Sequence, residues 1–364
     1  MVDVRCTRCG KPYPKTGAPF KCECGGSFDF INLPAFSGNE IDPLEHGLWK
    51  YHRLMGFDAD IQRVTLGEGN TALLPLSISG EEIYLKLEYQ NPTASYKDRG
   101  STALISFLKS REVIYAVEDS SGNAGASFAA YAARAGIQAR VYVPSTASGP
   151  KRAQIEAYGA ELVEVPGPRS EAARAVLAEV EKGAVYASHA YMPFGLAGIA
   201  TIAYEIVQQL GQAPGTIIAP IGHGGLMYGL MKGFEAMVAG SAIREEPYYL
   251  GVQSSACAPV AAAFKNGIQI PTPITPAETI AEGVKVGDPV RGQAILYHIH
   301  STRGKIVTVE DHHLLDAYHS MARSGFFVEP TSALVIAAIS GDVESLPKPI
   351  VGILTGAGIK TKSY

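Results

Sequence analysis

The chain lacks several features that would place it in a specialised class of protein. It has no basic surplus, because 31 lysines and arginines stand against 35 aspartates and glutamates, so nucleic acid is not an expected partner. No apolar run reaches the roughly 18 residues that a membrane-spanning helix needs, so no membrane association is expected. The start, MVDVRCTRCGK, lacks the basic and then apolar pattern of a secretory signal, which predicts a cytoplasmic protein.

Internal repeats and low-complexity tracts are also missing. Apolar residues make up 46% of the 364 residues and charged residues 18%, a composition that excludes a disordered chain. At about 150 residues per domain, this length predicts two or three lobes.

Cysteine is scarce, yet four of the five cysteines lie within one short segment: Cys6, Cys9, Cys22 and Cys24. They form C-x2-C, twelve residues and C-x-C, and glycine follows each pair. In a reducing compartment such paired thiols favour a metal over disulfides, and four thiolates suit structural zinc. We therefore predict a zinc ribbon over residues 1–29; a loop of reduced thiols and a redox switch remain alternatives. Cys257 is expected to be a buried apolar residue without a role.

Short apolar runs alternate with amphipathic stretches from residue 83 onward. Predicted strands cover 83–87, 113–116, 139–143, 162–165, 184–187, 216–220, 248–252, 305–309 and 350–354. Predicted helices cover 98–108, 124–135, 151–158, 170–180, 196–210, 226–238, 312–323 and 331–339. The alternation predicts an α/β protein with open parallel sheets, in which ligands bind where strands end and helices begin. His298 and His300 alternate as on a strand, whereas His312 and His313 fall on a solvated helix start.

Four loops that follow predicted strands carry polar or glycine-rich sequences. N-P-T-A-S-Y-K-D-R-G at 91–100 places Lys97 at a helix start, where a partly desolvated amine is suited to Schiff-base chemistry. S-S-G-N-A-G at 120–125 and G-H-G-G-L at 222–226 each open a helix and can cradle an anion. L-T-G-A-G at 354–358 adds one hydroxyl. One amine, two anion cradles and a hydroxyl fit a site for pyridoxal phosphate and an amino-acid carboxylate.

The lysine motif resembles N-P-T-G-S-F-K-D-R-G of the threonine synthase branch of the fold-type II pyridoxal-phosphate enzymes. L-G-E-G-N-T at 66–71, S-S-G-N-A-G, E-P-T-S-A at 329–333 and L-T-G are similar to that branch in order and spacing. The resemblance covers nearly the whole chain, and some members carry a four-cysteine ribbon. It implies two open, twisted αβα domains with the cofactor between them. The implied ranges are a small domain at 111–195 and a large cofactor-binding domain made of 30–110 and 196–364.

The resemblance also implies roles for residues in the first two loops. Lys97 corresponds to the lysine that binds the cofactor aldehyde and shuttles the substrate proton. Asn123 corresponds to the residue that hydrogen-bonds the cofactor's phenolic oxygen. Ser120, Ser121 and Ala124, with Asn123, correspond to the loop that grips the substrate carboxylate. Ser121 and Asn123 can alternatively be plain helix caps.

Further roles are implied for residues of the last two loops. The phosphate loop corresponds to Gly222, His223, Gly224, Gly225 and Leu226. Thr355 corresponds to the hydroxyl beside the pyridine nitrogen, where a neutral group gives a mild electron sink that suits elimination and replacement. His223 replaces a residue that is commonly glycine or asparagine, and its role stays open. Glu329 is expected to shape a turn near the cofactor, with a catalytic role as the alternative.

One stretch departs from the family pattern. Threonine synthases usually read N-P-x-R-x-x-G-x-K-T where this chain reads M-P-F-G-L-A-G-I-A-T at 192–201. The asparagine, arginine and lysine that help to hold a substrate phosphate thus fall on Met192, Gly195 and Ala200. A buried phosphate needs charged or polar donors, so this stretch favours a less anionic substrate.

The resulting prediction is a pyridoxal-phosphate lyase that acts on a small amino acid, with threonine synthesis from O-phosphohomoserine as the leading reaction. A serine or threonine ammonia-lyase, or a β-replacement enzyme on an activated serine, is the enzymatic alternative. A non-catalytic binding protein with this fold is the alternative from another class. The resemblance further implies a homodimer.

Overall fold

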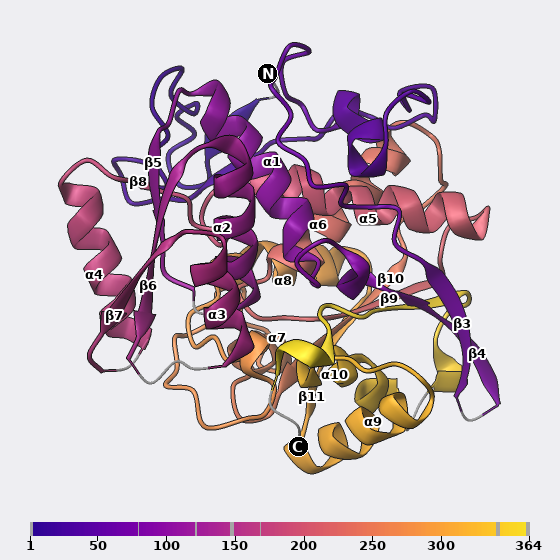
Figure 1. Ribbon diagram of the computed structural model, residues 1–364. Helices are drawn as coiled ribbons and strands as arrows, with labels where there is room; N and C mark the ends of the chain where they lie inside the picture. Colours follow the sequence, from indigo (N-terminus) through magenta and orange to yellow (C-terminus); the bar gives the residue numbers. More distant parts are fainter. Residues whose placement is uncertain are drawn as a thin grey trace. The chain divides into compact units, whose positions relative to one another are not determined.

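The computed structural model describes residues 3–78, 80–120, 122–145, 149–167, 169–339 and 343–361, with only the backbone of Arg169 included (Figure 1). These residues form two compact units, which are described in turn. Unit 1 comprises Met1–Pro34, Asn39–Gly69 and Asn91–Ile199. Unit 2 comprises Ala35–Gly38, Asn70–Gln90 and Ala200–Tyr364.

Unit 1 contains a four-stranded parallel sheet with strand order β7-β6-β5-β8. Its strands are β5 (Tyr115–Glu118), β6 (Gln138–Pro144), β7 (Glu161–Val165) and β8 (Val185–Tyr186). Its helices are the 3-10 helix η1 (Gly47–Leu54), α1 (Lys97–Ser110), α2 (Asn123–Ala135), α3 (Pro150–Ala157), α4 (Arg169–Glu181) and the first turns of α5 (Phe194–Leu210). Figure 1 shows α2 and α3 on one face of this sheet and α4 on the other. The alanine-rich α2 ends at Gly136, whose φ of +70° is the left-handed conformation that glycine adopts freely.

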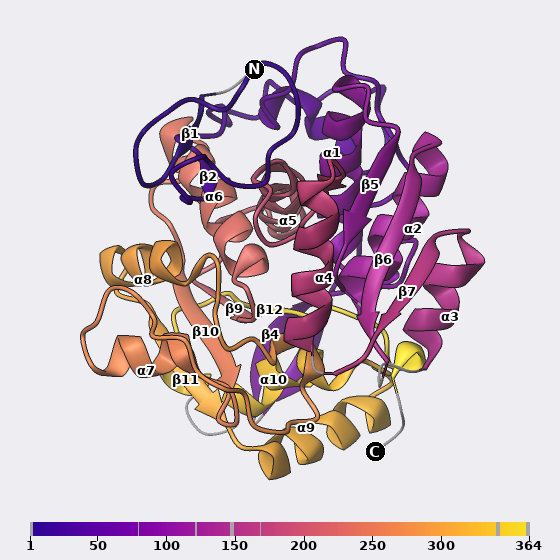
Figure 2. The ribbon, with the colours of Figure 1, turned by 90° about the vertical axis from the view of Figure 1, so that its left-hand side faces the viewer.

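The N-terminal part of unit 1 is a small antiparallel ribbon of β1 (Val4–Cys6) and β2 (Phe28–Phe30), visible in Figure 2. The turns after the cysteine pairs depend on glycine, because Gly10 has a φ of +73° and Gly25 a φ of +82°. Both glycines were expected to turn the chain after a cysteine pair. This arrangement is compatible with the small zinc ribbon that the sequence predicts.

Unit 2 contains a six-stranded sheet with strand order β11-β10-β9-β12-β4-β3. Its strands are β3 (Leu73–Ile78), β4 (Glu81–Lys86), β9 (Thr216–Pro220), β10 (Tyr248–Ser254), β11 (Lys305–Val309) and β12 (Ile350–Ile353). Its α-helices are the rest of α5, α6 (Gly225–Ala239), α7 (Pro259–Lys265), α8 (Gly292–Ser301), α9 (Asp311–Arg323) and α10 (Pro330–Ile339). Four short 3-10 helices complete it: η2 (Glu88–Gln90), η3 (Glu282–Val284), η4 (Val343–Ser345) and η5 (Gly358–Lys360). All neighbouring strands are parallel except the β3–β4 pair.

Helices cover both faces of the six-stranded sheet. Leu250 of β10 belongs to the same buried cluster as Tyr318 of α9 and Leu334 of α10. The neighbouring Tyr249 points to the opposite face, where its ring lies 6.3 Å from that of Phe234 in α6. The fully buried β9 reads T-I-I-A-P, a continuous apolar run that is typical of a central parallel strand.

The predicted α/β class with open parallel sheets is confirmed, with three differences in detail. The reading of His298 and His300 as strand residues is wrong, because both lie in α8, whose buried residues recur at helical spacing. The short α7 and the antiparallel β3 were not expected. Unit 1 includes 91–110, which the predicted domain ranges assigned elsewhere, because α1 packs on α2; the domain ranges themselves stay a prediction.

Across the ranges that the structure describes, no helix combines the length and apolar character needed to cross a membrane.

Candidate functional site

The lysine loop ends where α1 begins, and Lys97 is the first residue of that helix. Its side chain is partly exposed, and Nζ lies 4.9 Å from the centroid of the Tyr96 ring. Ala94 has a φ of +62°, a left-handed conformation that disfavours any side chain with a Cβ. Ser95 is fully buried, and among the described residues its hydroxyl has no hydrogen-bond partner. A buried hydroxyl in this state, two residues before the lysine, fits a loop that receives a polar ligand.

Asp98 fixes the lysine loop from within α1, a role that the sequence reasoning missed. Its buried carboxylate accepts hydrogen bonds from the backbone N–H of Thr93 at 2.6 Å and from the Thr93 hydroxyl at 2.5 Å. It also accepts a hydrogen bond from the Ser127 hydroxyl in α2, at 2.6 Å. One carboxylate thus joins the loop before Lys97 to α2. An aspartate directly after the lysine, in the first turn of a helix, was the available signal.

The predicted carboxylate loop lies between β5 and α2. Ser120 is buried, Asn123 and Ala124 are the first two residues of α2, and Ser121 lies outside the described residues. A Cβ on Gly125 would lie 1.8 Å from the Ser120 carbonyl oxygen, so only glycine allows this close turn. The first-turn N–H groups of α2 have no acceptor within the helix and can bind an anion.

Two acidic residues directly before this loop were not singled out from the sequence. Glu118 is fully buried, and its Oε1 accepts a hydrogen bond from Nδ1 of His189 at 2.6 Å. Asp119 accepts a hydrogen bond from the Tyr186 hydroxyl at 2.8 Å. Burial and the neighbouring Asp119 raise the pKa of Tyr186 well above its usual value, so this hydroxyl stays a donor. The two pairs join the 186–189 segment to the end of β5.

The predicted phosphate loop in unit 2 follows β9 and opens α6. Gly224 has a φ of +93°, and a Cβ there would lie 2.5 Å from a side-chain atom of Ile295. A Cβ on Gly222 would lie 2.9 Å from the carbonyl oxygen of Gly283. A Cβ on Gly225 would meet nothing within 4 Å, so the space at the start of α6 is open. Open space at the N-terminus of a 15-residue helix suits a phosphate.

Thr355 lies in a buried polar cluster at the end of β12. Its hydroxyl donates to Oε1 of Glu329 at 2.9 Å and lies 2.9 Å from the Ser332 hydroxyl. A Cβ on Gly356 would lie 2.5 Å from the Glu329 carboxyl carbon, so glycine is needed beside this carboxylate. Glu329 and Ser332 thus fix the direction of the hydroxyl that the sequence singled out.

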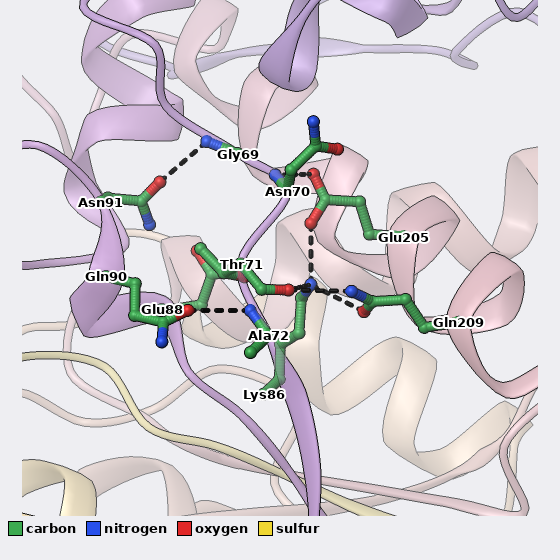
Figure 3. A network of polar contacts seen from close by, with 10 residues as sticks. All are labelled: Gly69, Asn70, Thr71, Ala72, Lys86, Glu88, Gln90, Asn91, Glu205 and Gln209. Carbon is green, nitrogen blue, oxygen red and sulfur yellow. Dashed lines mark hydrogen bonds and ion pairs between the residues drawn. The ribbon is translucent and has the colours of Figure 1, made fainter.

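A buried polar network in unit 2 surrounds the segment after Gly69 (Figure 3). Lys86 is fully buried, and its Nζ donates to the Thr71 carbonyl at 2.7 Å, Glu205 Oε2 at 2.7 Å and Gln209 Oε1 at 2.9 Å. Glu205 Oε1 accepts a hydrogen bond from the Asn70 backbone N–H at 2.8 Å. The network therefore holds the end of the L-G-E-G-N-T motif by its backbone.

The four N-terminal cysteines lie together, with all four Sγ atoms within 4.8 Å of one another. Sγ of Cys6 is 3.4 Å from that of Cys24, and Sγ of Cys9 is 3.7 Å from that of Cys22. Thiolates around tetrahedral zinc, at about 2.3 Å from the metal, lie about 3.8 Å apart. Burial opposes ionisation of Cys6, but backbone N–H donors outweigh it and lower its pKa to about 6. This donor set fits a closed, structural zinc site.

Comparison with known proteins decides the family. Residues 64–356 match the family described as pyridoxal-phosphate dependent enzyme. The chain belongs to this family. It is 34% identical to a threonine synthase of Methanocaldococcus jannaschii, over 98% of this chain and 92% of that protein. It is also 34% identical to a threonine synthase of Halalkalibacterium halodurans, over 86% of this chain and 89% of that one.

Solved structures agree with the family. A threonine deaminase from the organism abbreviated T.th. superposes with a TM-score of 0.67 at 28% identity, over 78% of this chain and 89% of that one. Maize serine racemase superposes with a TM-score of 0.70 at 22% identity, over 80% of this chain and 88% of that one, which shows the fold alone. The fold of this pyridoxal-phosphate dependent enzyme is therefore fold type II, as the sequence motifs predicted.

The chain's own residues fit the cofactor of the family. Unit 1 supplies the amine of Lys97, the buried hydroxyl of Ser95 and the start of α2 at Asn123. Unit 2 supplies the open, glycine-rich start of α6 and the oriented hydroxyl of Thr355. The role of each residue toward the cofactor remains a prediction.

The three positions that depart from the threonine synthase pattern are largely buried. Met192 is 2% exposed and Ala200 is fully buried in α5. A Cβ on Gly195 would lie 3.3 Å from the carbonyl oxygen of Gly100 in α1, which is a tight contact. Packing against α1 therefore explains the glycine at 195, because a longer side chain would press on that helix.

Proposed function

We propose that this enzyme is a threonine synthase, which converts O-phosphohomoserine and water into threonine and phosphate. The observation that carries the proposal is the lysine loop with its adjoining carboxylate loop, in a chain whose relatives named threonine synthase align along nearly its whole length. When bound, pyridoxal phosphate supplies an electron sink for the α-carbon of the amino acid. The remaining work falls to the protein.

Each residue has a defined task in this proposal. Lys97 Nζ takes the α-proton of the substrate and returns it. Ser120 and the first N–H groups of α2 bind the substrate carboxylate. The start of α6 holds the cofactor phosphate, and Thr355 contacts the pyridine nitrogen. Water adds at the β-carbon, and the γ-phosphate leaves with its electron pair.

The direct test is turnover of O-phosphohomoserine by the purified holoenzyme, with phosphate and threonine measured together. We expect one threonine for each phosphate. Lys97→Ala should abolish turnover and the visible absorbance band of the lysine-linked cofactor. Lys265→Ala, at an exposed lysine of α7, is the matched control and should change neither. Phosphate release without threonine would contradict the proposal.

A second candidate is a serine or threonine ammonia-lyase, or a β-replacement enzyme. It is favoured by the buried, uncharged Met192 and Ala200, since phosphate recognition normally uses arginine or lysine. Incubation with serine, threonine, O-phosphoserine and O-phosphohomoserine separates the candidates. Formation of a 2-oxo acid from serine or threonine, with O-phosphohomoserine inert, would establish the second candidate.

The non-catalytic alternative predicts no visible absorbance band in wild-type protein supplied with pyridoxal phosphate. Retention of the Lys97 loop argues against it.

The cysteine cluster is proposed to hold one zinc ion. Metal analysis of the purified chain should give one zinc per chain, and Cys9→Ser should reduce it. A homodimer, testable by light scattering, and a cytoplasmic location remain predictions.

A further inference from the structure

The loop between the two cysteine pairs carries two aromatic side chains that pack on other parts of unit 1. Tyr13 is the first, and its ring centroid lies 5.0 Å from Phe194, 5.8 Å from Phe107 and 4.7 Å from Phe28. Its hydroxyl donates to the Pro19 carbonyl at 3.0 Å, which holds the loop against itself. Tyr13 is therefore fixed by the ribbon and packs against α1 and α5.

The residues that Tyr13 contacts belong to the crossing of α1 and α5. Phe107 of α1 and Phe194, the first residue of α5, stack with centroids 3.5 Å apart and planes 12° apart. A Cβ on Gly198 of α5 would lie 1.8 Å from the Arg99 carbonyl oxygen of α1, so the two backbones touch there. This contact is two residues from Lys97. The crossing thus sets the position of the helix that begins with the lysine.

Phe20 is the second aromatic residue, and it packs beside the carboxylate loop. Its ring lies 5.0 Å from Tyr186 and 5.6 Å from Tyr191. Tyr186 in turn donates its hydroxyl to Asp119, the residue before Ser120. The ribbon therefore reaches both the lysine helix and the carboxylate loop through packed rings.

The ribbon has little other structure to keep this loop in place. Its strands β1 and β2 are three residues each, and such a short pair is marginal by itself. Four-thiolate zinc sites supply folding free energy to small elements of this kind. Order in the 10–21 loop, and so in Tyr13 and Phe20, then depends on the metal.

We propose that the zinc ribbon is a metal-dependent brace for substrate binding, in which Tyr13 and Phe20 are positioning residues that hold α1, α5 and the 186–191 segment. Neither residue touches substrate. The substrate readout rests on the proposed function, but the coupling between ribbon and loops does not. Removal of zinc should loosen both loops while the cofactor stays linked to Lys97.

The first test is hydrogen exchange of the holoenzyme before and after zinc removal with a thiol reagent and chelator. We expect faster exchange in peptides that cover 97–107 and 186–194, and unchanged exchange in β10 of unit 2. Faster exchange confined to residues 3–30 would overturn the proposal. This readout requires no knowledge of the substrate.

The second test uses Phe20→Leu and Tyr13→Leu in the full chain, with zinc content and the visible cofactor band checked first. We expect KM for O-phosphohomoserine to rise roughly tenfold, within the ~100-fold loss that a misplacement of about 1 Å can cause. The conservative Phe20→Tyr should restore KM. Tyr297→Leu, at a tyrosine of α8 that is 73% exposed, is the control and should leave KM unchanged.

The outcomes separate this inference from the proposed function. Unchanged KM in both leucine variants, with zinc bound, overturns the brace. Wild-type protein that fails to turn over O-phosphohomoserine overturns the proposed function, and hydrogen exchange then still decides whether the ribbon acts on the two loops.

Discussion

Replacement of Lys86 by methionine is the sharpest stability prediction. The ammonium group is fully buried and donates to three oxygens at 2.7, 2.7 and 2.9 Å, one of them on the carboxylate of Glu205. Methionine has similar length but no donor. It would leave a carboxylate that is 2% exposed with its charge uncompensated.

The magnitude follows from that unpaired charge. Removal of one partner from a buried ion pair destabilises a protein by about 3–5 kcal/mol. At about 1.4 kcal/mol per factor of ten, the folded-to-unfolded ratio should fall by roughly a hundredfold to a few thousandfold. The double variant Lys86→Met/Glu205→Gln removes both charges and keeps an oxygen for the Asn70 N–H. It should therefore be more stable than the single variant.

Urea denaturation of the holoenzyme, followed by circular dichroism at matched cofactor concentration, measures these differences. Lys285→Met is the matched control, because its partner Glu278 has a side chain that is 95% exposed. The control should unfold close to wild type, since exposed pairs contribute little. A Lys86→Met variant that unfolds with the control, or a double variant less stable than the single one, would refute the reasoning.

Three further predictions concern the unit 1 loops. Asp98→Asn weakens three hydrogen bonds to a buried carboxylate and should lower the free energy of unfolding by about 2–4 kcal/mol, with a shifted visible cofactor band as the spectroscopic check. Gly125→Ala should raise KM and lower the melting temperature because its Cβ meets backbone at 1.8 Å, whereas Gly100→Ala, with ordinary contacts at 3.5 Å, should be tolerated; equal effects would contradict this. Ala94→Gly relieves a φ of +62° and should stabilise the chain by about 1 kcal/mol in urea denaturation, and a loss of stability would count against strain at this position.

Local signals in the sequence determined much of the fold and the loops. Strand β9 was predicted at its observed bounds, because a short apolar run between turn residues is a local pattern. The lysine at a helix start and the glycines after each cysteine pair were likewise readable, since turn geometry depends on adjacent residues. Where the local pattern was short, as for His298 and His300, periodicity misled, because two alternating residues do not distinguish a strand from a helix face.

Only the tertiary structure decided how these pieces are held. Lys86 and Glu205 are 119 positions apart, and Asp98 and Ser127 are 29 apart, so neither pair leaves a mark in the local pattern. The aromatic contacts of Tyr13 follow the same rule, because a ring reads as apolar wherever it will pack. The sequence by itself determined which groups can do chemistry. Folding decided which of them are fixed in place, because burial and hydrogen bonding between distant segments exist only after the chain has packed.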